Sequence, residues 1–367
     1  MSVTYIVDDQ DPAIEYLCPV QHQTVRDNYL HNTYTTIDSV DCGGGWFKYT
    51  FNGTSVRVSN RLKPVDARYA VQVDISPMLQ RSGNGVYESP ELADGSEHSI
   101  VYAIGNQSFF PAFDYLTVTA GQSTQLRGRT IIVDDADPAM EYSGNWRNEP
   151  ITPPAMNFDY TSSPYRDTTH WSNTVGDSVN FTFEGTSVTV YGIIPASNAT
   201  IPNRNLTATY SIDDGQRNSL SLSPGSTEGR PIAMTELLRS GELAAGKHTM
   251  VFTVTDIPNL SLSGVGIDFV TYNASFDNLS SIGAGTPSTA GAISDGHIPV
   301  WKPVLGAVLG LLALLVAGLL GSLYWRKRKQ SKAQAKATSK VFVVRALKDH
   351  NIVNEKDGKA GSLTPDV

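Results

Sequence analysis

The stretch "IVDDQDPAIEY", residues 6–16, is written a second time as "IVDDADPAMEY" at residues 132–142. Nine of the eleven positions are identical, and the offset between the copies is 126 residues. Each copy is a β-branched run that leads into three aspartates and a proline. Because Val and Ile favour strands while Asp before Pro favours a turn, the stretch predicts a strand followed by a turn at the start of each copy.

Three further pairs of motifs follow in the same order. They are "FNGTSVRV" (51–58) with "FEGTSVTV" (183–190), "ELADGSEHSIVY" (91–102) with "ELAAGKHTMVF" (242–252), and "FDYLTV" (113–118) with "IDFVTY" (267–272). A duplicated unit of roughly 120–145 residues explains this pattern. Apolar residues alternate with polar ones in each copy, which indicates strands. The Asn52-Gly53 and Glu184-Gly185 steps predict hairpin turns. Short strands separated by polar turns predict an all-β protein built from β-sandwiches.

The order of these motifs resembles that of galactose-binding-like jelly-roll modules, which occur in tandem on single-pass membrane surface proteins of mushroom-forming fungi. The resemblance implies two tandem jelly-roll β-sandwich domains, at residues 1–120 and 130–276, with a linker at 121–129. It also implies a non-catalytic surface protein whose modules bind glycan, in adhesion or in sensing of wall polysaccharide. Two other functions stay open: a glycosylated structural spacer or protein–protein adhesin, and a surface hydrolase.

Residues 303–325 form an apolar run without a charged residue, flanked by Trp301 and by the basic residues 326–329. Its length matches a bilayer core of about 30 Å, and the basic flank places the C-terminus in the cytoplasm. The sequence therefore predicts a stalk at 277–302, a transmembrane helix at 303–325 and a disordered tail at 326–367 with an unknown cytoplasmic partner. Residues 1–302 would lie outside, at the plasma membrane or another secretory-pathway membrane.

The charges divide at the same point. Residues 326–367 hold 11 Lys/Arg and 4 Asp/Glu, which leaves 17 and 32 for the remainder, a net charge of −15. An acidic outer part of this size argues against nucleic acid as its partner. The start "MSVTYIVDD" has neither a basic nor an apolar leader region, so we expect either that a leader is missing or that the membrane segment directs export.

Two features fit an extracellular location. Cys18 and Cys42 lie 24 residues apart and either pair or remain free thiols. Eight Asn-x-Ser/Thr sequons precede the apolar run and none follows it, which predicts a glycosylated outer part. They start at Asn52, Asn106, Asn180, Asn198, Asn205, Asn259, Asn273 and Asn278.

The repeated acids are candidates for a structural calcium site. Three carboxylates within four residues repel one another unless they are neutralised, and calcium binds carboxylate oxygens. The resemblance adds an aspartate of the closing strand from each copy. The alternative is that the acids only shape a turn and a strand edge. The candidate ligands are Asp8, Asp9, Asp11, Asp114, Asp134, Asp135, Asp137 and Asp268.

Aromatic residues in polar segments are candidate platforms for sugar rings. The alternative for each is packing in the core. The candidates are Trp146, Trp171, Tyr160, Tyr165 and Trp46, the last of which follows three glycines and is expected in an exposed loop. His98 and His248 recur just before a strand, which favours a structural role. The chain contains no GxSxG, HExxH, CxxC or P-loop motif, so we expect no catalytic residue and no cofactor besides calcium.

Overall fold

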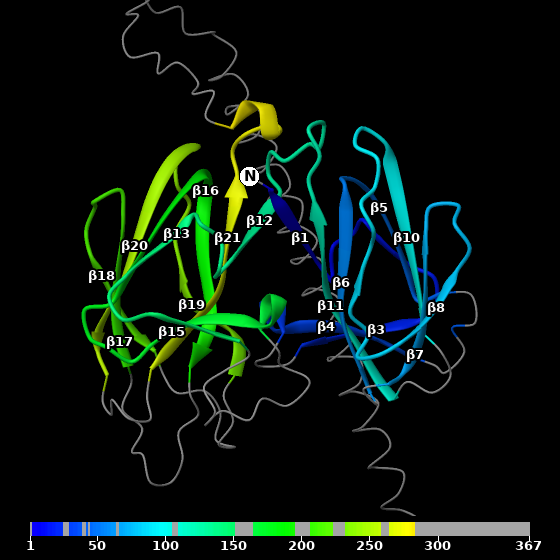
Figure 1. Cartoon of the computed structure of the whole chain (residues 1–367), viewed down its shortest axis with the longest axis horizontal. Coiled ribbons are helices and arrows are strands. Elements are labelled where there is room, and N and C mark those ends of the chain that lie inside the picture. The colour runs from blue at the N-terminus through cyan, green and yellow to red at the C-terminus, as the bar shows by residue number, and fades with distance from the viewer. Residues whose placement is uncertain are drawn as a thin grey trace, which may run out of the picture. The chain divides into compact units, whose positions relative to one another are not determined.

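The structure is a computed structural model, and it describes residues 2–24, 29–38, 42, 45–63, 66–104, 109–150, 164–194, 206–222, 232–257 and 264–282. All of these residues belong to one compact unit. Within them the chain is all-β, with short 3-10 turns as its helical elements (Figure 1). We call residues 2–120 repeat 1 and residues 130–276 repeat 2.

Repeat 1 contains two antiparallel sheets. One is built around β11 (Phe109–Thr119), which pairs with β1 (Thr4–Asp8), β4 (Thr33–Ile37) and β6 (Ser55–Lys63). It also includes β3 (Val20–Thr24) and β9 (Tyr87–Glu88). The other sheet has the order β2-β5-β10-β7-β8. Its strands are β2 (Ile14–Tyr16), β5 (Phe47–Asn52), β7 (Arg68–Val73), β8 (Leu79–Ser82) and β10 (Glu97–Ile104).

Repeat 2 repeats this order. Around β21 (Val265–Ala274) lie β12 (Thr130–Asp134), β15 (Thr168–Ser172) and the second half of β16 (Ser178–Ile194), with β14 (Arg147–Pro150) and β19 (Ile232–Arg239) beyond them. The first half of β16 pairs with β13 (Met140–Ser143) and β20 (Gly246–Asp256), followed by β17 (Leu206–Ile212) and β18 (Asn218–Leu222). The 3-10 turns η1 (Leu30–Asn32) and η2 (Tyr165–Asp167) precede β4 and β15, and η3 (Leu279–Ser281) follows β21. The duplication predicted from the sequence is confirmed strand by strand.

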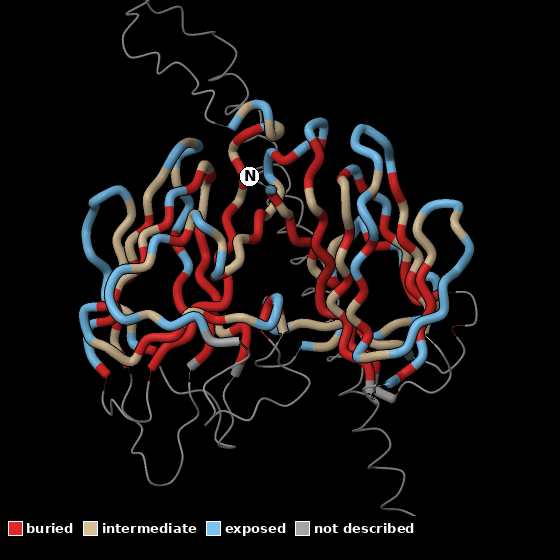
Figure 2. The backbone as a smooth tube through the Cα atoms, in the orientation of Figure 1, coloured by how far each residue is buried: buried red, intermediate tan, exposed pale blue. Residues whose placement is uncertain are grey.

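The sheets curl in a way that is compatible with a β-sandwich, and their inward faces form the core. In β5 the residues Phe47, Tyr49 and Phe51 are buried while Lys48 and Thr50 between them point outward. Figure 2 shows this buried lining in both repeats. The period of two expected for a half-buried strand is therefore present.

Strands β1 and β12 join the two repeats. They pair antiparallel, with Thr4 opposite Ile132 and Tyr5 opposite Ile131. The guanidinium of Arg129 also lies 5.1 Å from the ring centre of Tyr5. The first sheets of the two repeats are consequently continuous through backbone hydrogen bonds.

The predicted hairpins at Asn52-Gly53 and Glu184-Gly185 are wrong. In repeat 1 the chain leaves one sheet and enters the other at this step, so β5 pairs with β10 whereas β6 pairs with β11. In repeat 2, β16 continues without a break, and its partner changes from β20 to β21. A Cβ on Gly53 would stand 2.6 Å from the carbonyl oxygen of Thr119, and one on Gly185 would stand 2.5 Å from that of Asn273. Glycine is needed there because the closing strand passes so near, and no reversal of the chain is involved.

No helix among the described residues is long and apolar enough to cross a membrane. The predicted transmembrane segment at 303–325, the tail, and the stalk from residue 283 onward lie outside the described residues.

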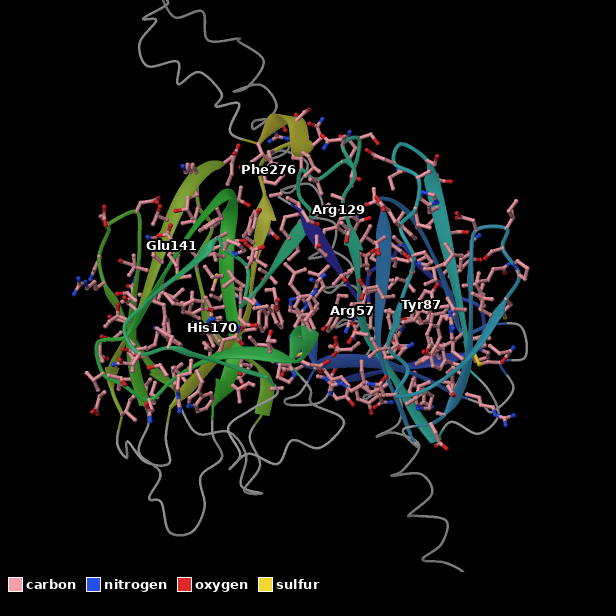
Figure 3. All side chains as sticks on the ribbon, in the orientation of Figure 1. Arg57, Tyr87, Arg129, Glu141, His170 and Phe276 are labelled. Carbon is pink, nitrogen blue, oxygen red and sulfur yellow. A yellow bond between two sulfur atoms is a disulfide. The ribbon has the colours of Figure 1, made fainter. Side chains whose placement is uncertain are left out.

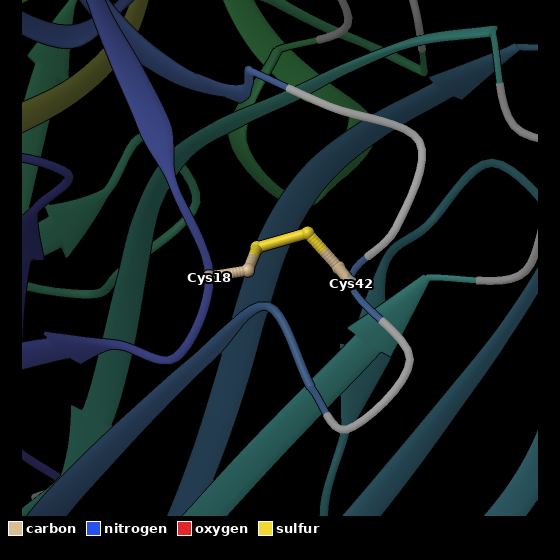
Figure 4. Close-up of a disulfide and its surroundings, with 2 residues drawn as sticks. All are labelled: Cys18 and Cys42. Carbon is tan, nitrogen blue, oxygen red and sulfur yellow. A yellow bond between two sulfur atoms is a disulfide. The ribbon is translucent and has the colours of Figure 1, made fainter.

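Cys18 and Cys42 form a disulfide with a Cα–Cα distance of 5.5 Å, which confirms the pairing alternative (Figure 4). It ties the segment after β2 to the segment before β5. Repeat 2 has no cysteine, so the bridge reinforces one repeat and is not required by the fold.

Replacing both cysteines with serine tests this role. Opening a loop of 24 residues removes about 3 kcal/mol from the free energy of unfolding by the chain-entropy argument. Urea unfolding of the wild type and the double variant measures the loss. A loss above about 6 kcal/mol, or failure of the variant to fold, would show that the bridge is a framework element after all.

Candidate functional site

The second aspartate of each repeated "DD" is a buried acceptor. Asp9 is fully buried, and its two carboxylate oxygens accept the hydroxyls of Thr33 at 2.8 Å and Thr35 at 2.6 Å. In repeat 2 the buried Asp135 accepts the hydroxyl of Thr168 at 2.7 Å, and Nδ1 of His170 lies 2.7 Å from its other oxygen (Figure 3 labels His170). Each carboxylate thereby holds the strand that follows η1 or η2.

The closing strand supplies a second buried aspartate at a β-bulge. The register of β6 with β11 shifts between Phe113 and Tyr115, and Asp114 is the residue between them. Asp268 occupies the corresponding shift between β16 and β21. A bulge re-aims the side chain of its extra residue. Here the carboxylates of Asp114 and Asp268 point to the turns η1 and η2.

These bulge residues connect three parts of each repeat. The backbone N–H of Asp9 donates to the carbonyl of Asp114 at 2.9 Å, and that of Asp135 donates to Asp268 at 3.0 Å. The carboxylates of Asp114 and Asp268 accept the N–H groups of Leu30 at 2.9 Å and of Tyr165 at 2.8 Å. The opening strand, the closing strand and the turn are thus held together.

The turns need this support because their backbone is unusual. His31 has φ 52° and Arg166 has φ 53°, a left-handed conformation that costs energy for non-glycine residues.

Burial changes the acidity of the network. It raises the pKa of Asp9 to about 6, although the Thr35 and Thr33 hydroxyls oppose the rise. It raises the pKa of Asp114 to about 7 against the charge of Arg61, and that of Asp268 well above its ordinary value. Burial, followed by the charge of Asp135, raises the pKa of Asp134 to about 7. Ionisation of these four aspartates therefore costs more free energy in the folded protein than in water.

The remaining candidate calcium ligands make local contacts. The carboxylates of Asp11 and Asp137 each accept a backbone N–H two residues on, at 2.8 Å, as in Asx turns. His31 Nδ1 lies 3.4 Å from Asp8. Across the described part of the chain, no three His, Cys, Asp or Glu side chains gather as a metal site. The turn-and-edge alternative accounts for these contacts, and the calcium site stays a prediction.

Replacing Asp135 with alanine separates the two alternatives. The variant leaves Thr168 and His170 without their buried acceptor, so we expect about 3 kcal/mol less unfolding free energy. Asp137→Ala, which removes only the turn contact, should lose about 1 kcal/mol. For each variant, the loss of unfolding free energy should be the same in EDTA as in calcium-containing buffer. Losses confined to the calcium-containing buffer would instead establish a calcium site.

The predicted aromatic platforms are mostly core residues. Trp46 is 0% exposed and packs against Phe47, Tyr102 and Phe113, so its expected exposed loop is wrong. Trp171 is 4% exposed and Tyr165 is 3% exposed, so neither ring offers a free face.

Close-packed glycines explain the burial of Trp171. A Cβ on Gly266 would stand 2.7 Å from its indole ring, and one on Gly264 would stand 2.9 Å from its Nε1. Trp146 is half-buried, contacts Tyr142, and donates from Nε1 to the carbonyl of Ser178 at 3.0 Å. Tyr160 lies outside the described residues.

His98 and His248 each close a clip with an aspartate in the neighbouring loop. His98 Nδ1 lies 2.8 Å from Asp74 and Nε2 lies 2.8 Å from the carbonyl of Ala93. His248 makes the same contacts with Asp213 at 2.6 Å and with the Ala244 carbonyl at 2.7 Å. Since both ring nitrogens face acceptors, the doubly protonated ring fits each clip. This supports the structural role predicted for these histidines.

The clips should make stability depend on pH. Burial alone would lower the pKa of His98 and His248, but their hydrogen bonds outweigh it and raise both above 6.5. Burial likewise opposes the histidine hydrogen bonds that lower the pKa of Asp74 and Asp213. A raised histidine pKa stabilises the fold below about pH 6.5, and this is lost as pH rises through the folded pKa. The aspartate contribution is lost only below about pH 4.

Changing His98 and His248 together to glutamine tests this dependence. Because the aspartates are partly exposed, each clip should contribute about 1 kcal/mol. The difference from wild type in urea unfolding should be largest near pH 5–6 and shrink toward pH 9. A difference that does not change with pH would contradict the charged-clip assignment.

An open groove of ≈560 Å³ lies on the outer face of the β5/β10 sheet, beside the first clip. Thr50 and Ser99 are opposite one another on β5 and β10. Ile75, in the loop after β7, is completely exposed at its edge. The remaining lining residues are polar or charged, and none is Trp, Tyr or Phe: Lys48, Asp74, Ser96, Glu97 and His98.

Repeat 2 presents the same face. Thr182 and Thr249 occupy the positions of Thr50 and Ser99, again opposite one another, with their hydroxyl oxygens 3.1 Å apart. Hydroxyl groups at these positions both donate and accept hydrogen bonds. The arrangement can therefore bind a ligand that carries many hydroxyls.

The structure describes four of the eight sequon asparagines. Asn52 is exposed at the end of β5. Asn180 donates to Glu141, Asn273 accepts from Thr130, and Asn278 caps η3. The remaining four, Asn106, Asn198, Asn205 and Asn259, lie outside the described residues.

No protein-family model and no curated protein matches this chain. Among solved structures, it is similar to a family two carbohydrate esterase from Cellvibrio japonicus, with 16% identity over 41% of this chain and 35% of that one, at a TM-score of 0.26. It is similar to a tandem CBM22 domain from Paenibacillus barcinonensis, with 9% identity over 74% of this chain and 97% of that one, at a TM-score of 0.24. It is also similar to the ANXUR1 extracellular domain from Arabidopsis thaliana, with 10% identity over 74% of this chain and 96% of that one, at a TM-score of 0.27. The chain spans 29–37% of the length of the first three matched structures.

Proposed function

We propose that the chain is a non-catalytic, single-pass cell-surface protein whose two repeats are jelly-roll modules that bind glycan. The observation that carries the proposal is the groove of ≈560 Å³ on the outer face of repeat 1. Its size lies within the range of small-ligand sites. The membrane helix at 303–325, the outer location of residues 1–302 and the cytoplasmic tail belong to the proposal and derive from the sequence.

The chemistry of the groove suits a sugar. Lys48 donates, Glu97 accepts, and Thr50 and Ser99 do both, which matches a ring edge of neighbouring hydroxyls. The exposed side chain of Ile75 offers an apolar contact for a C–H face. Since no Trp, Tyr or Phe ring lines the groove, binding would depend on hydrogen bonds and should be weak at each site. Two such faces on one chain can gain avidity on a polymer.

The carboxylates of the groove support the non-catalytic part of the proposal. Its carboxylates, Asp74 and Glu97, differ in role because Asp74 is engaged by His98 and by the N–H of Ser99 at 2.8 Å. That leaves Glu97 as the one lining carboxylate without such contacts, whereas glycoside hydrolysis uses a facing pair.

Blocking variants test the proposal. Thr50→Trp places a bulky ring in the groove, and we expect at least a tenfold loss of affinity for any oligosaccharide identified on a glycan array. Thr182→Trp does the same in repeat 2 and shows whether both faces bind. Ser82→Trp, on exposed β8, is the matched control and should bind as wild type.

Three outcomes would count against the proposal. They are absence of binding at millimolar oligosaccharide, unchanged affinity in both blocking variants, and turnover of a polysaccharide by the purified protein. The first would favour the spacer or adhesin alternative, and the last would favour a hydrolase.

A further inference from the structure

A second cavity, of ≈110 Å³, lies where the two repeats meet. Strand β6 of repeat 1 forms one wall and the turn η2 of repeat 2 forms the other. Figure 3 labels Arg57, which stands on β6. The lining residues that matter for its chemistry are Arg57, Asn60, Arg61, Tyr165, Arg166 and Asp167.

The walls of this cavity are held by an apolar cluster that both repeats share. Leu30 and Tyr115 of repeat 1 belong to the same buried cluster as Tyr165, Trp171 and Met234 of repeat 2.

A polar contact adds to the cluster. One guanidinium nitrogen of Arg61 lies 4.0 Å from the sulfur of Met234. The cavity is thus a feature of the packed junction.

One polar atom that faces the cavity is buried without a hydrogen-bond partner. Arg61 is 9% exposed; its Nη2 donates to Asp114 at 3.4 Å, while its Nη1 has no acceptor. Asn60 also lines the cavity, but its side chain lies on the core face of β6 with Val58 and Leu62. Burying an unsatisfied polar group costs about 1–3 kcal/mol. One wall therefore offers a free donor.

The charges around the cavity identify the kind of ligand. The guanidiniums of Arg57, Arg61 and Arg166 line the cavity. Two of them already have a carboxylate partner: Glu88 pairs with Arg57 at 2.9 Å, and Asp114 pairs with Arg61. Asp167 lines the cavity, and the carboxylate of Asp134 interacts with Arg166. A bare anion would be repelled by Asp167. A ligand with one carboxylate and several hydroxyls satisfies both kinds of group.

We propose that this cavity binds one uronic-acid residue. Its carboxylate accepts from Nη1 of Arg61 and from the guanidinium of Arg166, and its ring hydroxyls donate to Asp167. The planar forks of arginine suit a carboxylate. The site uses none of the groove residues, so it stands independently of the proposed groove.

Binding of monosaccharides to the purified full-length chain in detergent tests the site. By isothermal titration calorimetry, glucuronate or galacturonate should bind saturably. The corresponding neutral hexoses should bind at least tenfold more weakly, and so should inorganic sulfate. The neutral sugars probe the need for the carboxylate, and sulfate probes the need for the hydroxyls.

Arg166→Asn is the main variant, because asparagine tolerates the left-handed backbone at this position while the charge is removed. Uronate affinity should fall at least tenfold. Arg217→Asn removes an exposed arginine from the turn after β17 and should leave it unchanged. Arg61→Lys keeps the charge but loses the fork, and should also weaken binding.

The outcomes separate this site from the groove. Thr50→Trp should leave uronate binding intact. If that variant abolishes binding and Arg166→Asn does not, the acidic sugar binds in the groove and the cavity assignment is wrong. Equal affinity for sulfate and uronate, or no saturable binding of uronate, would also overturn it.

Discussion

The hydrogen bonds between the opening aspartate and the closing-strand bulge are the constraint on which each repeat depends. Asp9 and Asp135 bring the first strand beside the last through backbone bonds to Asp114 and Asp268. Their buried carboxylates need donors, since an unpaired buried charge is prohibitively costly. The Thr and His side chains of β4 and β15 supply them. Satisfying the acids therefore fixes where the next strand lies.

The same constraint places the turns that face the junction. Because Asp114 and Asp268 accept the N–H groups of Leu30 and Tyr165, the residue that follows each is held left-handed. That residue is His31 in repeat 1 and Arg166 in repeat 2. The two copies share these hydrogen bonds to the turn, but the side chains at the turn differ. Where β6 carries Arg61, the equivalent position of β16 carries the buried Ile193. These two differences between the copies lie at the junction, which is where the proposed uronate cavity lies.

Much of the frame could be predicted from the sequence, because it depends on local patterns written twice. The repeated motifs predicted the duplication, the alternation of apolar and polar residues indicated strands, and the recurrence of His98 and His248 indicated a structural role. Trp46 and Trp171 could not be placed this way, since their burial depends on packing against distant strands. The glycines at 264 and 266 were the available signal for Trp171. The predicted hairpins failed because glycine marks both tight turns and close approach of another strand, and only the position of the closing strand distinguishes them. The cavity joins positions 61 and 166, which no local pattern connects.

The location of the aromatic rings bears on how such a protein could recognise sugar. Some of the rings stack on one another: the ring centres of Phe47 and Phe113 are 4.1 Å apart, and those of Tyr142 and His170 are 3.9 Å apart. Because these rings pack in the core or on β15, which Asp135 holds, they are not available to a ligand. The outer faces described above mainly present hydroxyl and charged groups. Hydrogen bonds made by such groups in water contribute little each, because the ligand gives up equivalent bonds to water. Discrimination would then come from groups that water cannot reach. In the described part of the chain, Arg61 is a buried residue of this kind that lines a cavity. An open polar groove that binds loosely and a cavity with a buried arginine that selects by charge would therefore divide affinity from specificity between two places on the same chain.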